Sequence, residues 1–233
     1  MPLRIPTALL VAAAIALPAT AAAHDLWLEA DGGALVLRTG HRGSAPRPLD
    51  ASRVTSILCL RGAPPAAEVR PAATAAATEV RIPGRCDVAS ALLDGGYWSL
   101  TPDGERNLPR TRVPDAVRSW QSRRLAKWLD ARSPAAGAVL GDELEIVPVG
   151  DLSRVRQGEE ATFRVLSRGK PVAGAAVAVG HHAAGQTDAA GEWRVRIRAS
   201  GVESVSARLK TPLGTPEAET LVLEASLTFA VAR

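Results

Sequence analysis

The chain has 233 residues, a formal net charge of +4 at pH 7 and a hydrophobic fraction of 46%, which fits one large or two small domains. Its arginines are not interleaved with aromatic side chains on which bases could stack, so no nucleic-acid partner is expected. Beyond residue 17 no apolar run reaches the roughly 18 residues that a membrane helix needs, and we expect no membrane span in the mature chain.

Residues 1–23 have the pattern of a signal peptide. Arg4 supplies a positive charge, residues 8–17 form an apolar segment, and Ala21 and Ala23 give a small-residue cleavage site. We therefore expect a periplasmic protein that begins at His24. A free N-terminal histidine offers its α-amine and a ring nitrogen to the same ion, a bidentate site for copper, nickel or zinc. Cleavage one or two residues away would remove this site.

Residues 24–141 are predicted to form a β-rich lobe. Short runs that alternate or are rich in β-branched residues, bounded by Gly, Pro or Asp, predict strands at residues 26–29, 34–38, 54–60, 79–82 and 97–101.

Cys59 and Cys86 are the only cysteines of the chain. Export places them in an oxidising compartment, which favours a disulfide between them, worth about 3–4 kcal/mol in the chain-entropy model. The alternative is a thiolate metal site, but no further cysteine is present to complete one.

Residues 114–130 are predicted to form the one helix of the chain, as a packing element. Pro114 suits a helix start, and apolar residues such as Trp120, Leu125 and Trp128 recur at helical spacing.

Residues 142–233 are predicted to form a second β lobe, after a Pro-, Gly- and Ala-rich connection at residues 133–141. Polar turns separate the predicted strands, which lie at residues 144–149, 161–166, 175–179, 193–198, 204–209 and 227–231. The fold class is therefore mainly β, with one or more antiparallel β-sandwiches of immunoglobulin or transthyretin-like type.

Several segments resemble a bacterial periplasmic family described as a domain of unknown function, or as a NikM-like component of nickel and cobalt uptake. They are residues 23–29, 40–42, 126–127, 144–149, 156–159, 163–166, 169–175, 187–191 and 226–229. The chain departs from common members in having little tyrosine and in having Asp-Leu-Ser at residues 151–153, where a proline often follows the aspartate. The resemblance implies a periplasmic β-sandwich that binds or presents a transition metal, encoded beside metal transporters.

The candidate metal ligands are the four histidines, His24, His41, His181 and His182. In a hairpin of residues 26–38, positions 24 and 41 reach the same edge of the sheet, so His24 and His41 form the best pair. His181 and His182 are adjacent and serve one ion only if they lie in a loop; otherwise they are exposed turn residues. Asp25 and Glu29 are either additional oxygen donors or ordinary solvent-facing carboxylates.

These features favour a metal-binding accessory protein for uptake of nickel or cobalt, with a membrane transporter as a partner. Copper and zinc stay open, because the affinity order of such sites runs through all of these ions. One alternative is a copper protein of histidine-brace type, as a chaperone or an oxidative enzyme. Another is a structural or carbohydrate-binding β-sandwich without metal. No Gly-x-Ser-x-Gly nucleophile motif or phosphate-binding glycine loop occurs, so we expect no enzyme.

Overall fold

The computed structural model describes residues 25–69, 72–73 and 78–232. The expected signal peptide and His24 lie outside this part of the chain. The described residues form strands, two short 3-10 helices and no α-helix. The two 3-10 helices are η1 (Ala51–Arg53) and η2 (Arg110–Arg112).

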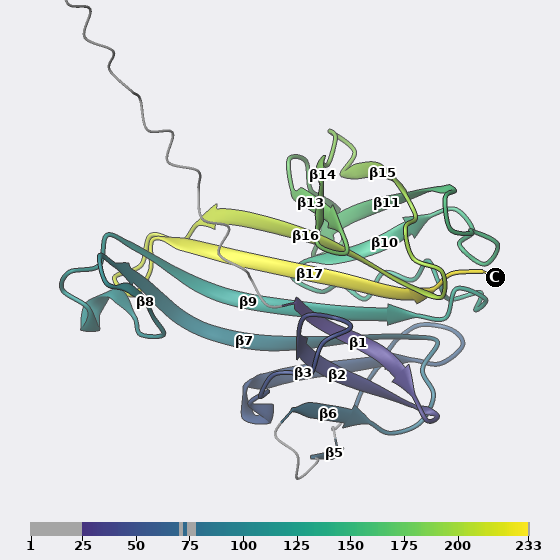
Figure 1. Cartoon of the computed structure of the whole chain (residues 1–233), viewed down its shortest axis with the longest axis horizontal. Helices are drawn as coiled ribbons and strands as arrows, with labels where there is room; N and C mark the ends of the chain where they lie inside the picture. Colours follow the sequence, from purple (N-terminus) through teal and green to yellow (C-terminus); the bar gives the residue numbers. More distant parts are fainter. Residues whose placement is uncertain (1–24, 70–71, 74–77, 233) are drawn as a thin grey trace, which may run out of the picture.

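A long twisted sheet forms the middle of the molecule (Figure 1). Its strands are β3 (Val54–Leu60), β4 (Ala67–Glu68), β7 (Val88–Thr101), β8 (Gly104–Arg106), β9 (Arg118–Leu129), β13 (Ala176–Val179), β14 (His182–Gln186), β16 (Val202–Pro212) and β17 (Thr220–Ala230). They lie in the order β14-β13-β16-β17-β9-β7-β3-β4, and β8 pairs with β7. Only β17 and β9 pair in parallel; the other neighbours are antiparallel.

Two smaller sheets cover the two faces of this central sheet. One contains β1 (Asp25–Asp31), β2 (Ala34–Gly40), β5 (Ala72–Ala73) and β6 (Glu79–Ile82), in the order β1-β2-β6-β5. The other contains β10 (Glu145–Val149), β11 (Glu160–Ser167), β12 (Lys170–Pro171) and β15 (Glu192–Arg196), with β11 paired to the other three. Figure 1 shows the β1–β2–β6 strands on one side of β9 and β17, and β10 and β11 on the other.

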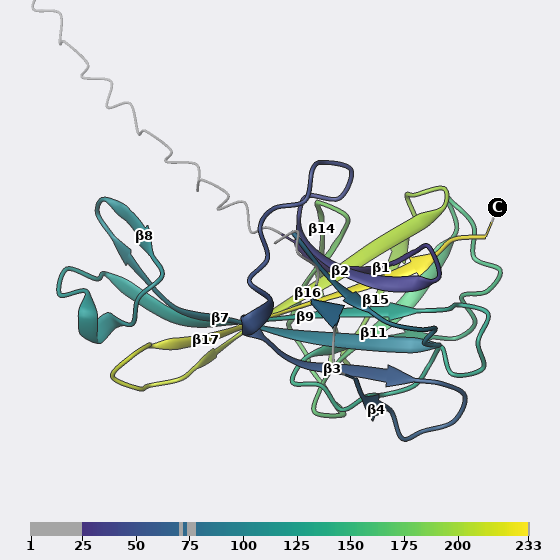
Figure 2. The same ribbon diagram turned by 90° about the horizontal axis from the view of Figure 1, so that it is seen from below.

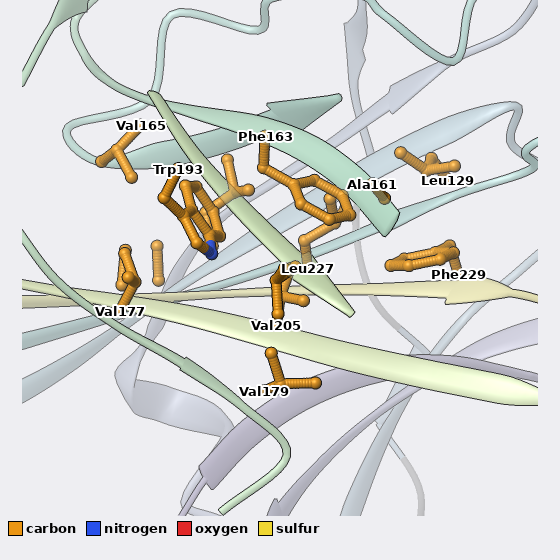
Figure 3. Close-up of a cluster of buried hydrophobic side chains, with 14 of the residues drawn as sticks. Leu129, Ala161, Phe163, Val165, Val177, Val179, Trp193, Val205, Leu227 and Phe229 are labelled. Atoms are coloured by element: carbon orange, nitrogen blue, oxygen red, sulfur yellow. The ribbon is translucent and has the colours of Figure 1, made fainter. Parts of the chain in front are cut away.

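Each face of the central sheet therefore has its own hydrophobic core. Phe163 of β11 lies in one core, with its ring 5.3 Å from that of Trp193 and 5.6 Å from that of Phe229 (Figure 3). Leu28 and Leu37 of the β1–β2 hairpin lie in the other core. The mainly β sandwich class predicted from the sequence is confirmed.

The predicted helix at residues 114–130 is wrong, because Arg118–Leu129 is strand β9. This strand is buried on both faces: Leu125 and Leu129 pack into the core beneath β10 and β11, while Ala126 packs into the core beneath β1 and β2. A strand covered on both sides loses the apolar–polar alternation of a half-exposed strand. The spacing of its large apolar residues then imitates a helical face.

The expected boundary at residue 141 separates the two outer sheets but not the central one. β9 precedes this boundary and β17 follows it, and ten residue pairs from Thr220–Trp120 to Phe229–Leu129 join them. Residues 133–141 contain no strand and connect the central sheet to β10, as the sequence predicts for this segment. Figure 2 shows that the β7–β8 end and the β16–β17 end project beyond both outer sheets.

The predicted disulfide between Cys59 and Cys86 is confirmed. Both residues are buried in the core beneath the β1–β2 hairpin. The bond ties β3 of the central sheet to the segment that follows β6 of the outer sheet.

Candidate metal centre

The β1–β2 hairpin places Asp25 beside His41. Asp25 begins β1 and pairs with Gly40, the last residue of β2, so His41 follows directly at the same end of the hairpin. The chain then turns, with the Ser44 amide donating to the His41 carbonyl, and returns so that the Arg47 amide donates to the Thr39 carbonyl. This turn holds His41 close to the strand it leaves.

A tight turn of the central sheet brings in His181. Val179 of β13 pairs with His182 of β14, which leaves a two-residue loop of Gly180 and His181. Gly180 has a φ of 53°, and glycine at the first loop position is typical of such hairpins. The loop therefore holds His181 at the turn itself and makes His182 the first residue of a strand.

Asp25, His41 and His181 converge at the contact between the outer and central sheets. One ligand atom from each lies within 4.8 Å of the others. His181 Nδ1 is 3.4 Å from Asp25 Oδ2, and the two imidazole rings meet edge to face with centroids 5.3 Å apart. Ligand atoms of a tetrahedral transition-metal site lie about 3.3 Å apart, since metal–nitrogen bonds are about 2.0–2.1 Å long. The three donors would therefore have to move closer together to share one ion.

The carboxylate of Asp25 is partly enclosed among positively charged groups. Burial raises its pKa above the usual value, and His181, His41, Arg124 and Arg42 oppose this rise electrostatically. A buried carboxylate pays a desolvation penalty for its negative charge. Protonation of Asp25, or binding of a cation to it, would remove part of this penalty.

Arg124 of β9 lies near this carboxylate. Its Nη2 donates to Thr39 Oγ1 at 2.6 Å, and Thr39 Oγ1 in turn donates to the Asp25 carbonyl at 3.0 Å. Burial lowers the pKa of Arg124, and the nearby Glu224 and Asp25 carboxylates oppose that shift. Asp25, His181 and Arg124 all line one pocket of about 420 Å³.

A family model, the domain of unknown function DUF4198, matches residues 21–210. The chain belongs to this family. It is also similar to a solved structure of fibronectin(III)-like modules of Clostridium thermocellum CbhA, with 12% identity and a TM-score of 0.25, over 91% of this chain and 92% of that one. A TM-score this low carries no argument about fold or function. No curated protein matched the chain.

Membership of DUF4198 confirms the domain-of-unknown-function part of the resemblance; the nickel and cobalt part stays a proposal. Among the described residues, no helix is long and apolar enough to cross a membrane.

Of the four histidines predicted as ligands, this DUF4198 protein brings His41 and His181 together. His182 is exposed on β14 and lies outside the cluster. His24 lies outside the described residues, so the predicted pairing of His24 with His41 stays a prediction. Asp25, which the sequence left open, joins the cluster. Glu29 instead forms an ion pair with Arg38.

Sequence reasoning missed Arg124 and Thr39. Arg124 lies in the segment that was predicted to be helical, and only its place on β9 brings it beside the β1–β2 hairpin. Thr39 carries no motif, and its contact with Arg124 follows from how the two sheets stack. A strand assignment for residues 118–129 is the one change that would have placed Arg124 on the face toward Asp25.

Proposed function

We propose that the protein binds one divalent transition-metal ion through Asp25, His41 and His181 in the periplasm, and passes it to a membrane transporter for nickel or cobalt uptake. The observation that carries this proposal is the convergence of the three donors from two separate sheets. Two imidazole nitrogens and one carboxylate oxygen suit late first-row divalent ions such as nickel, cobalt, copper and zinc.

The exposure of the site favours a carrier over a structural metal site. The side chain of His181 is 55% exposed and that of Asp25 is 35% exposed. Three protein ligands leave at least one coordination position for water or for a ligand from a partner, whereas structural zinc sites are closed by four protein ligands. An open and accessible ion can be exchanged, which delivery to a transporter requires.

Copper binding by a histidine brace is the second candidate. His24 is joined to Asp25 by a peptide bond, so their Cα atoms are about 3.8 Å apart. If export leaves His24 at the N-terminus, its α-amine and its ring therefore belong to the residue next to Asp25, which is a member of the cluster. Copper would then take the terminal histidine together with His41 or His181.

Cobalt titration followed by the visible d–d spectrum tests the proposal. The chain beginning at His24 is expected to bind one equivalent of Co²⁺, and His41→Ala is expected to lose this signal. A second form with one glycine added before His24 separates the two candidates: a site built from side chains is only weakened, whereas a histidine brace loses copper binding. The absence of any metal binding would contradict both candidates and favour the metal-free β-sandwich.

A further inference from the structure

The metal cluster opens into a pocket much larger than an ion. Asp25 and His181 stand at its edge, and strands β9, β13, β16 and β17 form its floor. Small side chains such as Ala178, Ser206 and Ser226 line this floor and leave about 420 Å³ of space. Pockets of about 300–1,000 Å³ are typical of small-molecule sites. The space therefore fits an organic ligand beside the metal.

The charges around the cluster weaken the binding of a dication that carries no anion with it. Asp25 is the one carboxylate of the cluster, and both Arg124 and Arg42 act on it electrostatically. The next carboxylate along the pocket, Glu224, forms an ion pair with Arg208, with Arg208 Nε 3.2 Å from Glu224 Oε1. A divalent ion would add two positive charges to a place where cationic groups already outnumber the acid.

Both arginines keep hydrogen-bonding capacity. A guanidinium has five N–H donors, and the hydrogen bond of Arg124 to Thr39 uses one of them. The Nε of Arg42 is buried and has no hydrogen-bond acceptor among the described residues, although its Nη1 reaches the Val202 carbonyl at 3.5 Å. Arginine binds carboxylates through paired charge-assisted hydrogen bonds. Of the two arginines, Arg124 lines the pocket, so its free donors match an anion with carboxylate groups.

We propose that the metal is bound as a complex with a small anion that carries at least two carboxylates, one on the metal and another on Arg124. This inference rests on the proposed metal site. The anion neutralises the excess positive charge and fills coordination positions that the three protein ligands leave open. The true cargo is then a metal–polycarboxylate chelate rather than the free ion.

Equilibrium dialysis at a fixed free Ni²⁺ concentration tests the proposal, with citrate as the polycarboxylate probe and acetate as the monocarboxylate control. For the chain beginning at His24, citrate is expected to raise the apparent Ni²⁺ affinity at least fivefold, within the usual range of coupling between two ligands. Acetate is expected to give a smaller gain.

Arg124→Gln is expected to have effects of opposite sign on the two measurements. Removing a cation beside the ion should raise the affinity for Ni²⁺ alone, while the gain from citrate disappears. Arg124→Lys, which keeps the charge, should retain part of the gain. Arg194→Gln, at an exposed arginine on β15, is the matched control and should behave like the wild type. Binding of Ni²⁺ alone by Arg124→Gln also shows that the variant is folded.

The possible failures are distinct. Nickel binding without any gain from citrate would overturn the chelate proposal and leave the metal site standing. The same holds if Arg124→Gln keeps the full gain. No nickel binding under either condition would overturn the proposed function itself.

Discussion

Asp142 is a carboxylate held in an unfavourable place. It lies just before β10, and burial raises its pKa to about 6; Ser90 opposes this shift, and the neighbouring Glu145 adds to it. Carboxylates at a turn are ordinarily solvated. Here the connection from β9 to β10 packs against the central sheet and encloses the carboxylate of Asp142.

The raised pKa predicts how stability depends on pH. Between about pH 4 and pH 6 the folded protein keeps a proton on Asp142 that the unfolded chain has released, so the free energy of unfolding falls as the pH rises through this window. Asp142→Asn removes this pH-dependent contribution to the free energy of unfolding. At pH 7.5 the variant should be more stable than the wild type by up to about 3 kcal/mol, and the gain should vanish near pH 4.

Urea unfolding at both pH values checks this prediction. Asp151→Asn is the control, because Asp151 is exposed and hydrogen bonds from Ser153 lower its pKa; it should give no gain at pH 7.5. A loss of stability in Asp142→Asn at pH 7.5 would contradict the account.

At the level of single residues, the sequence pointed to the chemistry of the site and to His41 and His181 among four candidate histidines, but it could not single these two out or add Asp25. Four histidines in a chain expected to be exported suggested a metal, and the position of His41 after a short hairpin was readable. The choice between His181 and His182 depends on a two-residue loop at Gly180, since one shift of register would exchange them. Asp25 could not be told from a solvent-facing acid, because its neighbours come from another sheet.

At the level of elements, β9 connects the layers through a buried ion pair. Lys127 Nζ lies 2.7 Å from Glu145 Oε2 of β10, and the two side chains are 3% and 1% exposed. Lys127 also donates to the Ala138 carbonyl, and Glu145 accepts from the Leu140 and Gly141 amides. The pair thus fixes the connection between the central sheet and β10.

Breaking this pair should be strongly destabilising. Lys127→Met leaves the Glu145 carboxylate buried without its cation and should lower the free energy of unfolding by about 3–5 kcal/mol. Lys127→Met combined with Glu145→Gln leaves no unpaired charge, so the double variant should lose less than the sum of the two single losses. Denaturant unfolding of all four proteins closes the cycle. Additive losses would mean that the two groups do not interact.

β9 also shows why the sequence predicted some strands correctly and mistook another for a helix. Strands with one exposed face, such as β15, kept a readable alternation of buried and exposed residues. β9 has buried residues on both faces, so its pattern carried no period of two. The covering layers that remove this pattern come from distant parts of the sequence.

At the level of the whole molecule, the three layers depend on a few long-range links. The disulfide between Cys59 and Cys86 joins β3 of the central sheet to the segment that leads from β6 of the outer sheet to β7. Ser226 Oγ of β17 donates to the Leu26 carbonyl at 2.5 Å and joins the same two layers. These links hold the hairpin that carries Asp25 and His41 against the sheet that carries His181.

Removal of the disulfide should therefore affect both stability and the metal site. The double variant Cys59→Ala and Cys86→Ala should lose about 3–4 kcal/mol of unfolding free energy. Under conditions where it stays folded, its metal affinity should also fall, since the outer sheet is held less firmly. Thermal unfolding with and without Ni²⁺ measures both effects, and an unchanged midpoint would contradict the first.

The central claim is that Asp25, His41 and His181 form one metal site across two sheets. Calorimetric titration of the chain beginning at His24 with Ni²⁺, comparing His181→Ala with His182→Ala, tests it most directly because the two residues are adjacent and both exposed. We predict that His181→Ala lowers the affinity for Ni²⁺ by at least about 10–100-fold. Mutation of a residue that only hydrogen-bonds to a metal ligand already lowers affinity by this much, and His181 is itself a proposed ligand. His182→Ala should bind like the wild type. Equal losses in both variants, or no loss in His181→Ala, would contradict the account.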